Sequence, residues 1–327
     1  MYCPSLQKIP IFFSFKGRDI VKISGFSFAR NAEKLYFPVK EAITSILPIC
    51  DEFVIAVGDC DDDDRTRSLI EGIGDPRIRI IDTIWPRPGE GDNHIYSGQT
   101  NLALSQCRGD WCFYIQSDEV VHEKYLPIIK ARCEELAGDS RVQGLLFDFR
   151  HFWGDYGHCQ GGHKWYSREI RIVRNGLEIV SWKDAQSFRL CEKKIKVARA
   201  GAEVFHYGYV RPPRLMQRKS YTHYVNYGGA GNADAAFKDR PVDFDYGPLD
   251  RTEKFTGAHP AVMAARIASM DWNDQLRRGG KRTSKFAHDR FKYRFLSFIE
   301  KRFLGGRQIG GFKNYILLKR RVLTAKR

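Results

Sequence analysis

Short apolar runs alternate with helical segments along the first 130 residues of this 327-residue chain. The runs are rich in β-branched and aromatic residues, which is typical of buried strands, and they lie at 21–28, 51–57, 77–82 and 111–115. The segments between them predict helices at 38–47, 63–73 and 98–107. Such alternation predicts an α/β fold with a mostly parallel sheet, right-handed crossovers and helices on both faces.

The pattern beyond residue 130 predicts more strands than helices. The expected strands lie at 142–150, 169–173, 177–182 and 202–206, and the expected helices at 125–137, 212–227 and 260–270. Residues 151–168 read as an irregular, aromatic and Gly-rich segment. Because no repeat or low-complexity linker divides the chain, we expect a lead-in at 1–20, one body at 21–272 and a tail at 273–327.

The net charge of +15 is concentrated in this tail. Residues 273–327 hold 17 Lys and Arg against three acids, a balance of +14, so the body is nearly neutral. A neutral body argues against nucleic acid as a partner. The tail mixes cations with Phe, Tyr and Leu in two amphipathic segments, 286–303 and 312–323, so we expect it to be basic and helical. Such segments suit an anionic membrane surface, and a helix packed on the body with its charges outward is the alternative.

The composition predicts neither a membrane span nor secretion. No apolar stretch approaches the roughly 20 residues of a transmembrane helix, and residues 9–15 are too short for a signal peptide. The eight cysteines include no C-x-x-C pair, which suits reduced thiols. We therefore expect a cytoplasmic protein, peripheral on the cytoplasmic face of the membrane if its tail binds lipid.

The stretch 109–120 ends a buried strand in two carboxylates, Asp118 and Glu119. Ligands of open α/β sheets usually bind at the carboxyl ends of strands, and carboxylates there can hold a hard divalent cation against a phosphate. The alternative is that both acids cap the helix that follows. Polar clusters after two other strands favour a shared site, because they meet at the same sheet edge.

A second acidic cluster follows the strand at 51–57. Residues 59–64 contain five Asp in six positions, and such crowding is costly unless a cation or a hydrogen-bond donor lies nearby. Asp59 comes first after the strand, where it can accept a hydrogen bond from a base or a ribose hydroxyl. The alternative is a solvated turn that caps the next helix.

Three segments, A-R-N-A-E at 29–33, G-D-C-D-D-D-D-R-T at 58–66 and the stretch 109–120, together resemble the signatures of family-2 glycosyltransferases with the GT-A fold. The resemblance implies that 21–130 is the nucleotide-sugar-binding half and 131–272 the acceptor half. It also implies a nucleotide-diphosphate sugar as donor, a UDP-sugar above all. The residues that it places at the nucleotide are Phe28, Arg30, Asn31, Glu33, Asp59, Gln116 and Ser117.

The same resemblance implies a metal site for Mg²⁺ or Mn²⁺. The family's D-x-D motif reads Gln116-Ser117-Asp118 here, so Asp118 carries the metal-facing carboxylate and Gln116 departs from the pattern. Family members place a further ligand, often His, after the sheet, and His206 fits that position, with a packed strand-end histidine as the alternative. Nearby cations that could meet the leaving diphosphate, or form a solvated helix face, are Arg211, Arg214, Arg218 and Lys219.

Inverting members of the family need a general base for the acceptor hydroxyl. Asp184 is our candidate, because it follows an apolar segment beside Trp182, and the alternatives are Glu119, Asp155 and Glu178.

The segment 151–168 holds several possible ligands. The spacing of His151, His158, Cys159 and His163 matches no standard zinc site. We expect instead an acceptor-facing loop formed by Trp153, Tyr156, Trp165 and Tyr166, because aromatic faces suit carbohydrate rings.

These observations predict an inverting glycosyltransferase that acts on a saccharide or lipid-linked hydroxyl, such as a cell-envelope glycan or glycolipid. A non-catalytic module that binds a nucleotide or polyanion through the basic tail is the alternative.

Overall fold

The structure is a computed structural model that describes residues 20–86, 94–280, 286, 288, 290–305, 308–311 and 313–319. The expected lead-in therefore lies outside the described residues, except for Ile20.

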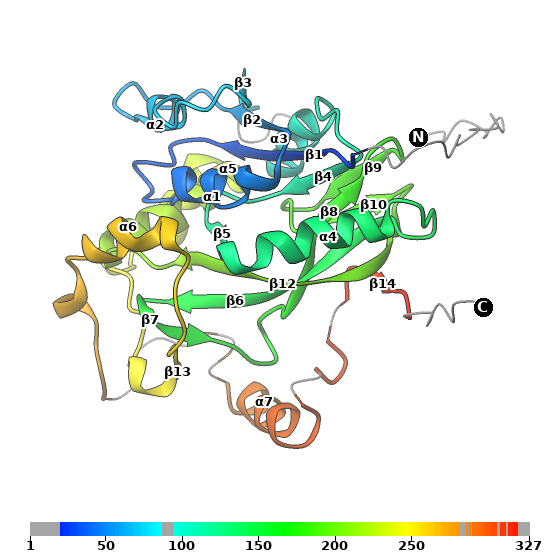
Figure 1. The fold of residues 1–327 in the computed structure, drawn as a ribbon. Coiled ribbons are helices and arrows are strands. Elements are labelled where there is room, and N and C mark those ends of the chain that lie inside the picture. Colours follow the sequence, from blue (N-terminus) through cyan, green and yellow to red (C-terminus); the bar gives the residue numbers. More distant parts are fainter. Residues whose placement is uncertain are drawn as a thin grey trace.

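The N-terminal half contains the predicted parallel sheet (Figure 1). Its order is β4-β1-β2-β3, and each neighbouring pair is parallel. These strands are β1 (Ile23–Ala29), β2 (Glu52–Val57), β3 (Ile78–Asp82) and β4 (Trp111–Tyr114). The helices between them are α1 (Val39–Ile46), α2 (Thr66–Glu71) and α3 (Ile95–Leu104). The α/β alternation read from the sequence is thus confirmed.

The two faces of this sheet are covered by different helices. Trp111, Phe113 and Ile115 pack in one core cluster with residues of α1 and of α4 (Leu126–Leu136). Cys112 and Tyr114 point to the other face, where α3 packs. The uninterrupted apolar run at 111–115 therefore belongs to a strand that is buried on both faces.

The sheet continues beyond β4 through antiparallel strands, so the complete sheet is mixed while its N-terminal half is parallel. β8 (Arg168–Arg174) pairs antiparallel with β4 and with β6 (Gly144–Trp153), while β12 (Lys196–Tyr209) pairs parallel with β6. The remaining strands at this end are β5 (Glu119–Val121), β7 (Asp155–Gln160), β13 (Glu253–Lys254) and β14 (Ile316–Leu317). A separate small sheet contains β9 (Ile179–Trp182), β10 (Ser187–Leu190) and β11 (Lys193–Lys194).

The segment 151–168 is more regular than the sequence suggested. β6 runs on to Trp153, and β7 pairs back onto it after a turn at Gly154, whose positive φ of 76° suits glycine. Trp153 and Tyr156 are buried in an aromatic core cluster. The expectation that these two residues face an acceptor is therefore wrong for the described structure, because their rings are used in packing.

Three further α-helices complete the body and the tail: α5 (Pro213–Phe237), the short α6 (Ala264–Ala268) and α7 (Phe291–Phe303). α5 contains a kink at Gly229, which has non-helical dihedral angles. The short 3₁₀ turns are η1 (Leu47–Ile49), η2 (Glu123–Tyr125), η3 (Leu249–Arg251), η4 (Ala261–Met263) and η5 (Asn273–Gln275). No helix in the described part of the chain has the length and apolar character needed to cross a membrane.

The tail packs on the body and is only partly helical. α7 lies within the predicted segment 286–303, but Ile316 and Leu317 of the segment 312–323 form strand β14. The amide of Ile316 donates to the carbonyl of Ile195, and the amide of Leu318 donates to the carbonyl of Val197. This segment therefore provides hydrogen-bond donors for backbone carbonyls at the start of β12. Phe312 and residues 320–323 lie outside the described residues.

Candidate functional site

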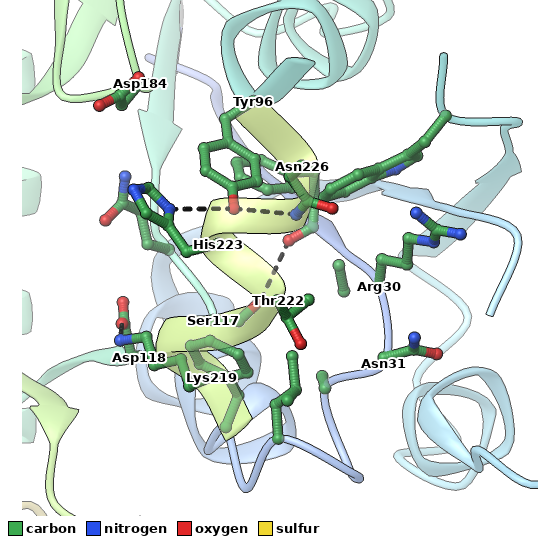
Figure 2. Close-up of a pocket in the computed structure, with 17 residues that line it drawn as sticks. Arg30, Asn31, Tyr96, Ser117, Asp118, Asp184, Lys219, Thr222, His223 and Asn226 are labelled. Atoms are coloured by element: carbon green, nitrogen blue, oxygen red, sulfur yellow. Dashed lines mark hydrogen bonds and ion pairs between the residues drawn. The ribbon is translucent and has the colours of Figure 1, made fainter. Parts of the chain in front are cut away.

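A pocket of about 240 Å³ opens at the carboxyl ends of β1 and β4, and α5 passes along it (Figure 2). Positions 219, 222, 223 and 226 of α5 line it, which is the spacing of one helix face. The lining residues are Phe28, Ala29, Arg30, Asn31, Ala32, Leu35, Phe37, Trp85, Tyr96, Gln116, Ser117, Asp118, Asp184, Lys219, Thr222, His223 and Asn226. The first polar turn, the end of β4 and Asp184 are thereby brought together.

Asp118 lies among cations at the inner end of this pocket. Its Oδ2 atom is 3.6 Å from Nε2 of His206 and 3.4 Å from Nζ of Lys219. Burial alone would raise the pKa of Asp118, but His206, Lys219 and the nearby Arg211 lower that pKa well below its usual range. Burial, followed by Arg211, lowers the pKa of Lys219 to about 8. Asp118 is therefore held as a buried carboxylate with Lys219 beside it.

A hydrogen-bond chain sets the orientation of His206. Nε2 of His151 lies 2.7 Å from the carbonyl oxygen of Tyr166, so this nitrogen must donate. Burial, followed by His206, lowers the pKa of His151 to about 3, so the ring is neutral and its Nδ1 is an acceptor. Nδ1 of His206 lies 3.0 Å from it and must donate. Because Nδ1 of His206 bonds to His151, Nε2 is the nitrogen of this ring that faces Asp118.

Gly208 keeps open the space between these two groups. A Cβ atom at this position would lie 2.5 Å from Nε2 of His206 and 2.7 Å from Oδ2 of Asp118. Real Cβ atoms do not approach so closely, so glycine leaves room where the carboxylate and the imidazole converge. An oxygen and a nitrogen ligand that face such a gap fit a divalent cation whose other ligands come from a diphosphate or water. The described residues contain no cluster of three or more His, Cys, Asp and Glu side chains that could hold a metal by themselves.

Gln116, which departs from the family motif, connects the site to the loop that carries Asp184. Its Nε2 donates to the carbonyl of Ala185 over 3.0 Å and lies 3.3 Å from the hydroxyl of Tyr114. The neighbouring Ser117 donates to the carbonyl of Phe28 over 3.0 Å, which joins the ends of β4 and β1. A carboxylate at position 116 could not donate to the carbonyl of Ala185, so this hydrogen bond to the loop requires the amide of Gln116.

Asp184 lies on the turn between β9 and β10 and is exposed to solvent. Both of its neighbours, Lys183 and Ala185, have a positive φ of 54°, an unusual conformation for residues with side chains. The hydroxyl of Tyr227, on α5, donates to Oδ1 of Asp184. The carboxylate is thus held at the pocket by a strained turn and a tyrosine.

The alternative bases lie elsewhere. Glu119 is completely buried and pairs with Arg171 over 2.6 Å. Asp155 pairs with His158 at the start of β7, and Glu178 is exposed and does not line the pocket. Asp184 is the candidate base that lines the pocket.

An aromatic wall forms the other side of the pocket. Tyr96 stacks on Phe28 at a ring distance of 5.7 Å and on His223 at 6.0 Å, and it meets Trp85 edge-on. The guanidinium of Arg30 lies over the ring of Trp85. Flat aromatic faces beside a cation suit the base and phosphates of a nucleotide.

The acidic turn mainly holds the first polar turn in place. Asn31 donates to Asp61 over 3.1 Å and accepts from its amide over 2.8 Å. Lys34 pairs with both Asp61 and Asp63. These cationic and amide partners offset the repulsion among the carboxylates, which the sequence alone left unexplained.

Two predicted nucleotide residues lie outside the pocket lining. Glu33 pairs with Arg65. Asp59 accepts from the amide of Trp85 over 3.0 Å and pairs with Arg30, two residues that line the pocket. Asn31, Arg30 and the remaining predicted residues of the two turns do line the pocket.

Of the four cations expected near a diphosphate, Lys219 alone lines the pocket. Arg211 is buried, donates to the carbonyls of Leu35 and Gly208 and lies over Phe37, so its role is structural. The residues that the sequence analysis overlooked are Trp85, Tyr96, His223, Asn226 and Gly208. For the residues of α5 among them, the sequence signal was the helical spacing of polar residues along 219–226.

A zinc site in the segment 151–168 is absent among the described residues. His151 bonds to His206, His158 pairs with Asp155, and His163 pairs with Glu300 of the tail. Each imidazole therefore has a structural partner.

No model of a known protein family matches the chain. The chain is 29% identical over 132 residues to the lipopolysaccharide core biosynthesis glycosyltransferase LpsC of Rhizobium meliloti (strain 1021), which covers 39% of this chain and 43% of LpsC. The matched part of the chain thus spans less than half the length of LpsC.

Among solved structures, TarS of S. aureus has 16% identity and a TM-score of 0.32, covering 66% of this chain and 72% of TarS. Glucosyl-3-phosphoglycerate synthase from Mycobacterium tuberculosis, in complex with Mg²⁺ and UDP, has 20% identity and a TM-score of 0.28, covering 40% of this chain and 44% of the synthase. The sequence similarity to a glycosyltransferase confirms the resemblance to family-2 glycosyltransferases that the three polar turns carry.

Proposed function

We propose that this chain is an inverting glycosyltransferase that moves a sugar from a nucleotide-diphosphate sugar to a hydroxyl group. One observation carries the proposal: Asp118, with His206 behind it, and Asp184 meet at a single pocket with an aromatic wall. The carboxylate of Asp118 could hold a metal ion, and the solvent-exposed carboxylate of Asp184 could accept a proton. Together they suit a reaction that needs both charge neutralisation and a base.

The donor would lie along the aromatic wall. Phe28, Trp85 and Tyr96 offer rings for the base, and Arg30 and Asn31 offer polar groups for the ribose or phosphates. A UDP-sugar is our proposed donor, since UDP is bound by glucosyl-3-phosphoglycerate synthase from Mycobacterium tuberculosis.

Asp118 and His206 would hold Mg²⁺ or Mn²⁺, which supplies charge neutralisation for a departing diphosphate when bound. Lys219 adds a cation from α5 at the same place, 3.4 Å from Asp118. The phosphate end of the donor is thereby oriented towards the inner end of the pocket.

Asp184 would act as the general base. Its carboxylate takes the proton of the acceptor hydroxyl as the oxygen forms a bond to the anomeric carbon. The bond between that carbon and the diphosphate oxygen breaks on the opposite face, and the nucleoside diphosphate leaves with the electron pair. Attack from the opposite face inverts the anomeric configuration.

The proposed acceptor is a saccharide or lipid-linked glycan of the cell envelope, since the relative LpsC is named for lipopolysaccharide core synthesis. The proposed location is the cytoplasm, where nucleotide sugars are the donors.

Nucleotide release from a panel of sugar nucleotides, with Mn²⁺ and a lipid-linked glycan, tests the proposal. We expect Asp118→Asn to lose the stabilisation by UDP plus Mn²⁺ over Mn²⁺ alone. Asp184→Asn should keep that stabilisation and lose turnover by about 10²- to 10⁴-fold. Asp62→Asn, on the exposed acidic turn, is the matched control and should behave like wild type.

Two results would contradict parts of the proposal. If Asp184→Asn turns over like Asp62→Asn, Asp184 is not the base. If no sugar nucleotide stabilises the wild-type chain and tail removal abolishes polyanion binding, the non-catalytic binding module is the better description.

A further inference from the structure

Helix α7 of the basic tail presents an apolar stripe to solvent. Phe291, Phe295 and Phe298 have exposed fractions of 81%, 54% and 58%. Their spacing of i, i+4 and i+7 puts the three rings on one face of the helix. Phe291 and Phe295 stack at a ring distance of 6.1 Å, so the rings form a continuous surface.

The opposite face of α7 fixes the helix on the body. Glu300, 2% exposed, accepts from Nδ1 of His163 over 2.7 Å and from the amide of Ile309 over 2.8 Å. The hydroxyl of Ser297 accepts from the amide of His163 over 2.9 Å. Because these contacts hold the inner face, the aromatic stripe cannot turn inward without breaking a buried pair.

Cations flank the stripe on both sides. Lys292 and Arg294 are exposed next to Phe291 and Phe295, and Arg302 continues the stripe one turn beyond Phe298. A hollow of about 460 Å³ beside Phe298 is lined by Arg294, Arg302 and three other cations, of which Lys301 pairs with Glu253. The basic residues that line this hollow are Lys164, Arg251, Arg294, Lys301 and Arg302.

We propose that α7 docks the protein on an anionic membrane surface. The phenylalanine stripe would enter the boundary between headgroups and acyl chains, and the flanking cations and the hollow would face lipid phosphates. A second copy of the chain is a poorer partner for this face, because two surfaces of the same positive charge would meet. Figure 1 shows α7 below β6 and β7, on the side away from α2 and α3.

Membrane docking itself needs no turnover, so it can be tested separately from the proposed function.

Flotation of the full chain with vesicles provides the test. Wild type should bind vesicles of phosphatidylcholine and phosphatidylglycerol, release at high salt, and bind pure phosphatidylcholine weakly. Replacing Phe291, Phe295 and Phe298 by Ser should lower the partition coefficient by about tenfold or more. The matched control is Val242→Ser, at an apolar residue that is 65% exposed in the loop after α5, and it should bind like wild type.

A triple Leu variant at the same three phenylalanine positions keeps the apolar stripe and should retain most of the binding. Circular dichroism of all variants checks that the fold is unchanged. The proposal is overturned if the wild-type protein does not bind anionic vesicles, or if the triple Ser variant binds them as the wild type does. Conversion of a wild-type dimer to a monomer by the Ser variant, without vesicle binding, would assign the face to a second copy instead.

Discussion

Nδ1 of His151 lies 3.0 Å from Nδ1 of His206, and both rings are buried. The contact links the carbonyl of Tyr166 to the face of His206 that approaches Asp118. His151 touches neither the pocket nor Asp118 directly, so it is a positioning residue. Groups of this kind commonly tune a ligand histidine by fixing its tautomer and ring orientation.

Replacing His151 by Phe should weaken Mn²⁺ binding in the presence of UDP by about 10- to 100-fold, because His206 loses its acceptor. Calorimetric titration with Mn²⁺ measures this without any turnover. His151→Gln can still accept from His206 and should recover part of the affinity. Equal Mn²⁺ affinity in wild type and the Phe variant would show that the pair has no such role.

Gly208→Ala should abolish the stabilisation by UDP plus Mn²⁺, because the new methyl group would occupy the gap between His206 and Asp118. The free protein should lose about 1–3 kcal/mol of stability through overpacking. Thermal unfolding with and without both ligands measures the two effects. Gly98→Ala is the control, since a Cβ there meets nothing within 4 Å, and its ligand-induced shift should equal that of wild type.

Gln116→Glu should release the loop that carries Asp184, because a carboxylate cannot donate to the carbonyl of Ala185. The lost bond would cost about 1–3 kcal/mol of local stability. Hydrogen exchange at residues 183–186 should become faster and turnover should fall, while UDP binding changes little. The exposed Gln106→Glu is the matched control. Unchanged exchange in the loop would rule out this anchoring role.

Glu300→Ala should destabilise the whole protein by about 2–4 kcal/mol, since His163 and the amide of Ile309 would lose a buried acceptor. Urea unfolding measures the difference. Glu71→Ala breaks the exposed pair with Arg67 and should stay within about 0.5 kcal/mol of wild type. Similar values for the two variants would mean that the tail is not integral to the fold.

Glu169 should make stability depend on pH. Burial raises the pKa of its carboxyl from 4.5 to about 6, against the opposing effect of Arg171. The folded state therefore binds more protons than the unfolded state between these values, and the free energy of unfolding falls as pH rises through this window, by about 2 kcal/mol. Glu169→Gln should lack this fall when unfolding is followed from pH 4 to 8. A parallel pH dependence in variant and wild type would contradict the assignment.

The parallel half of the sheet could be predicted because its information is local. Apolar runs such as 111–115, followed by polar turns, specify strands that are buried on both faces and end at one edge. Asp118 and the turn at 29–33 were found in this way, since each directly follows a strand in the chain.

The contacts that join distant segments could not be derived from local pattern. His151 and His206 meet because β6 and β12 pair with these two residues in register, and register depends on the packing of the whole sheet. The donor role of Gln116 depends on where the turn at Ala185 folds back, and the pairing of β14 with β12 joins residues more than 100 positions apart. Spacing along the chain locates the polar turns, whereas sheet register and long-range packing bring Asp118, His206 and Asp184 to a single pocket.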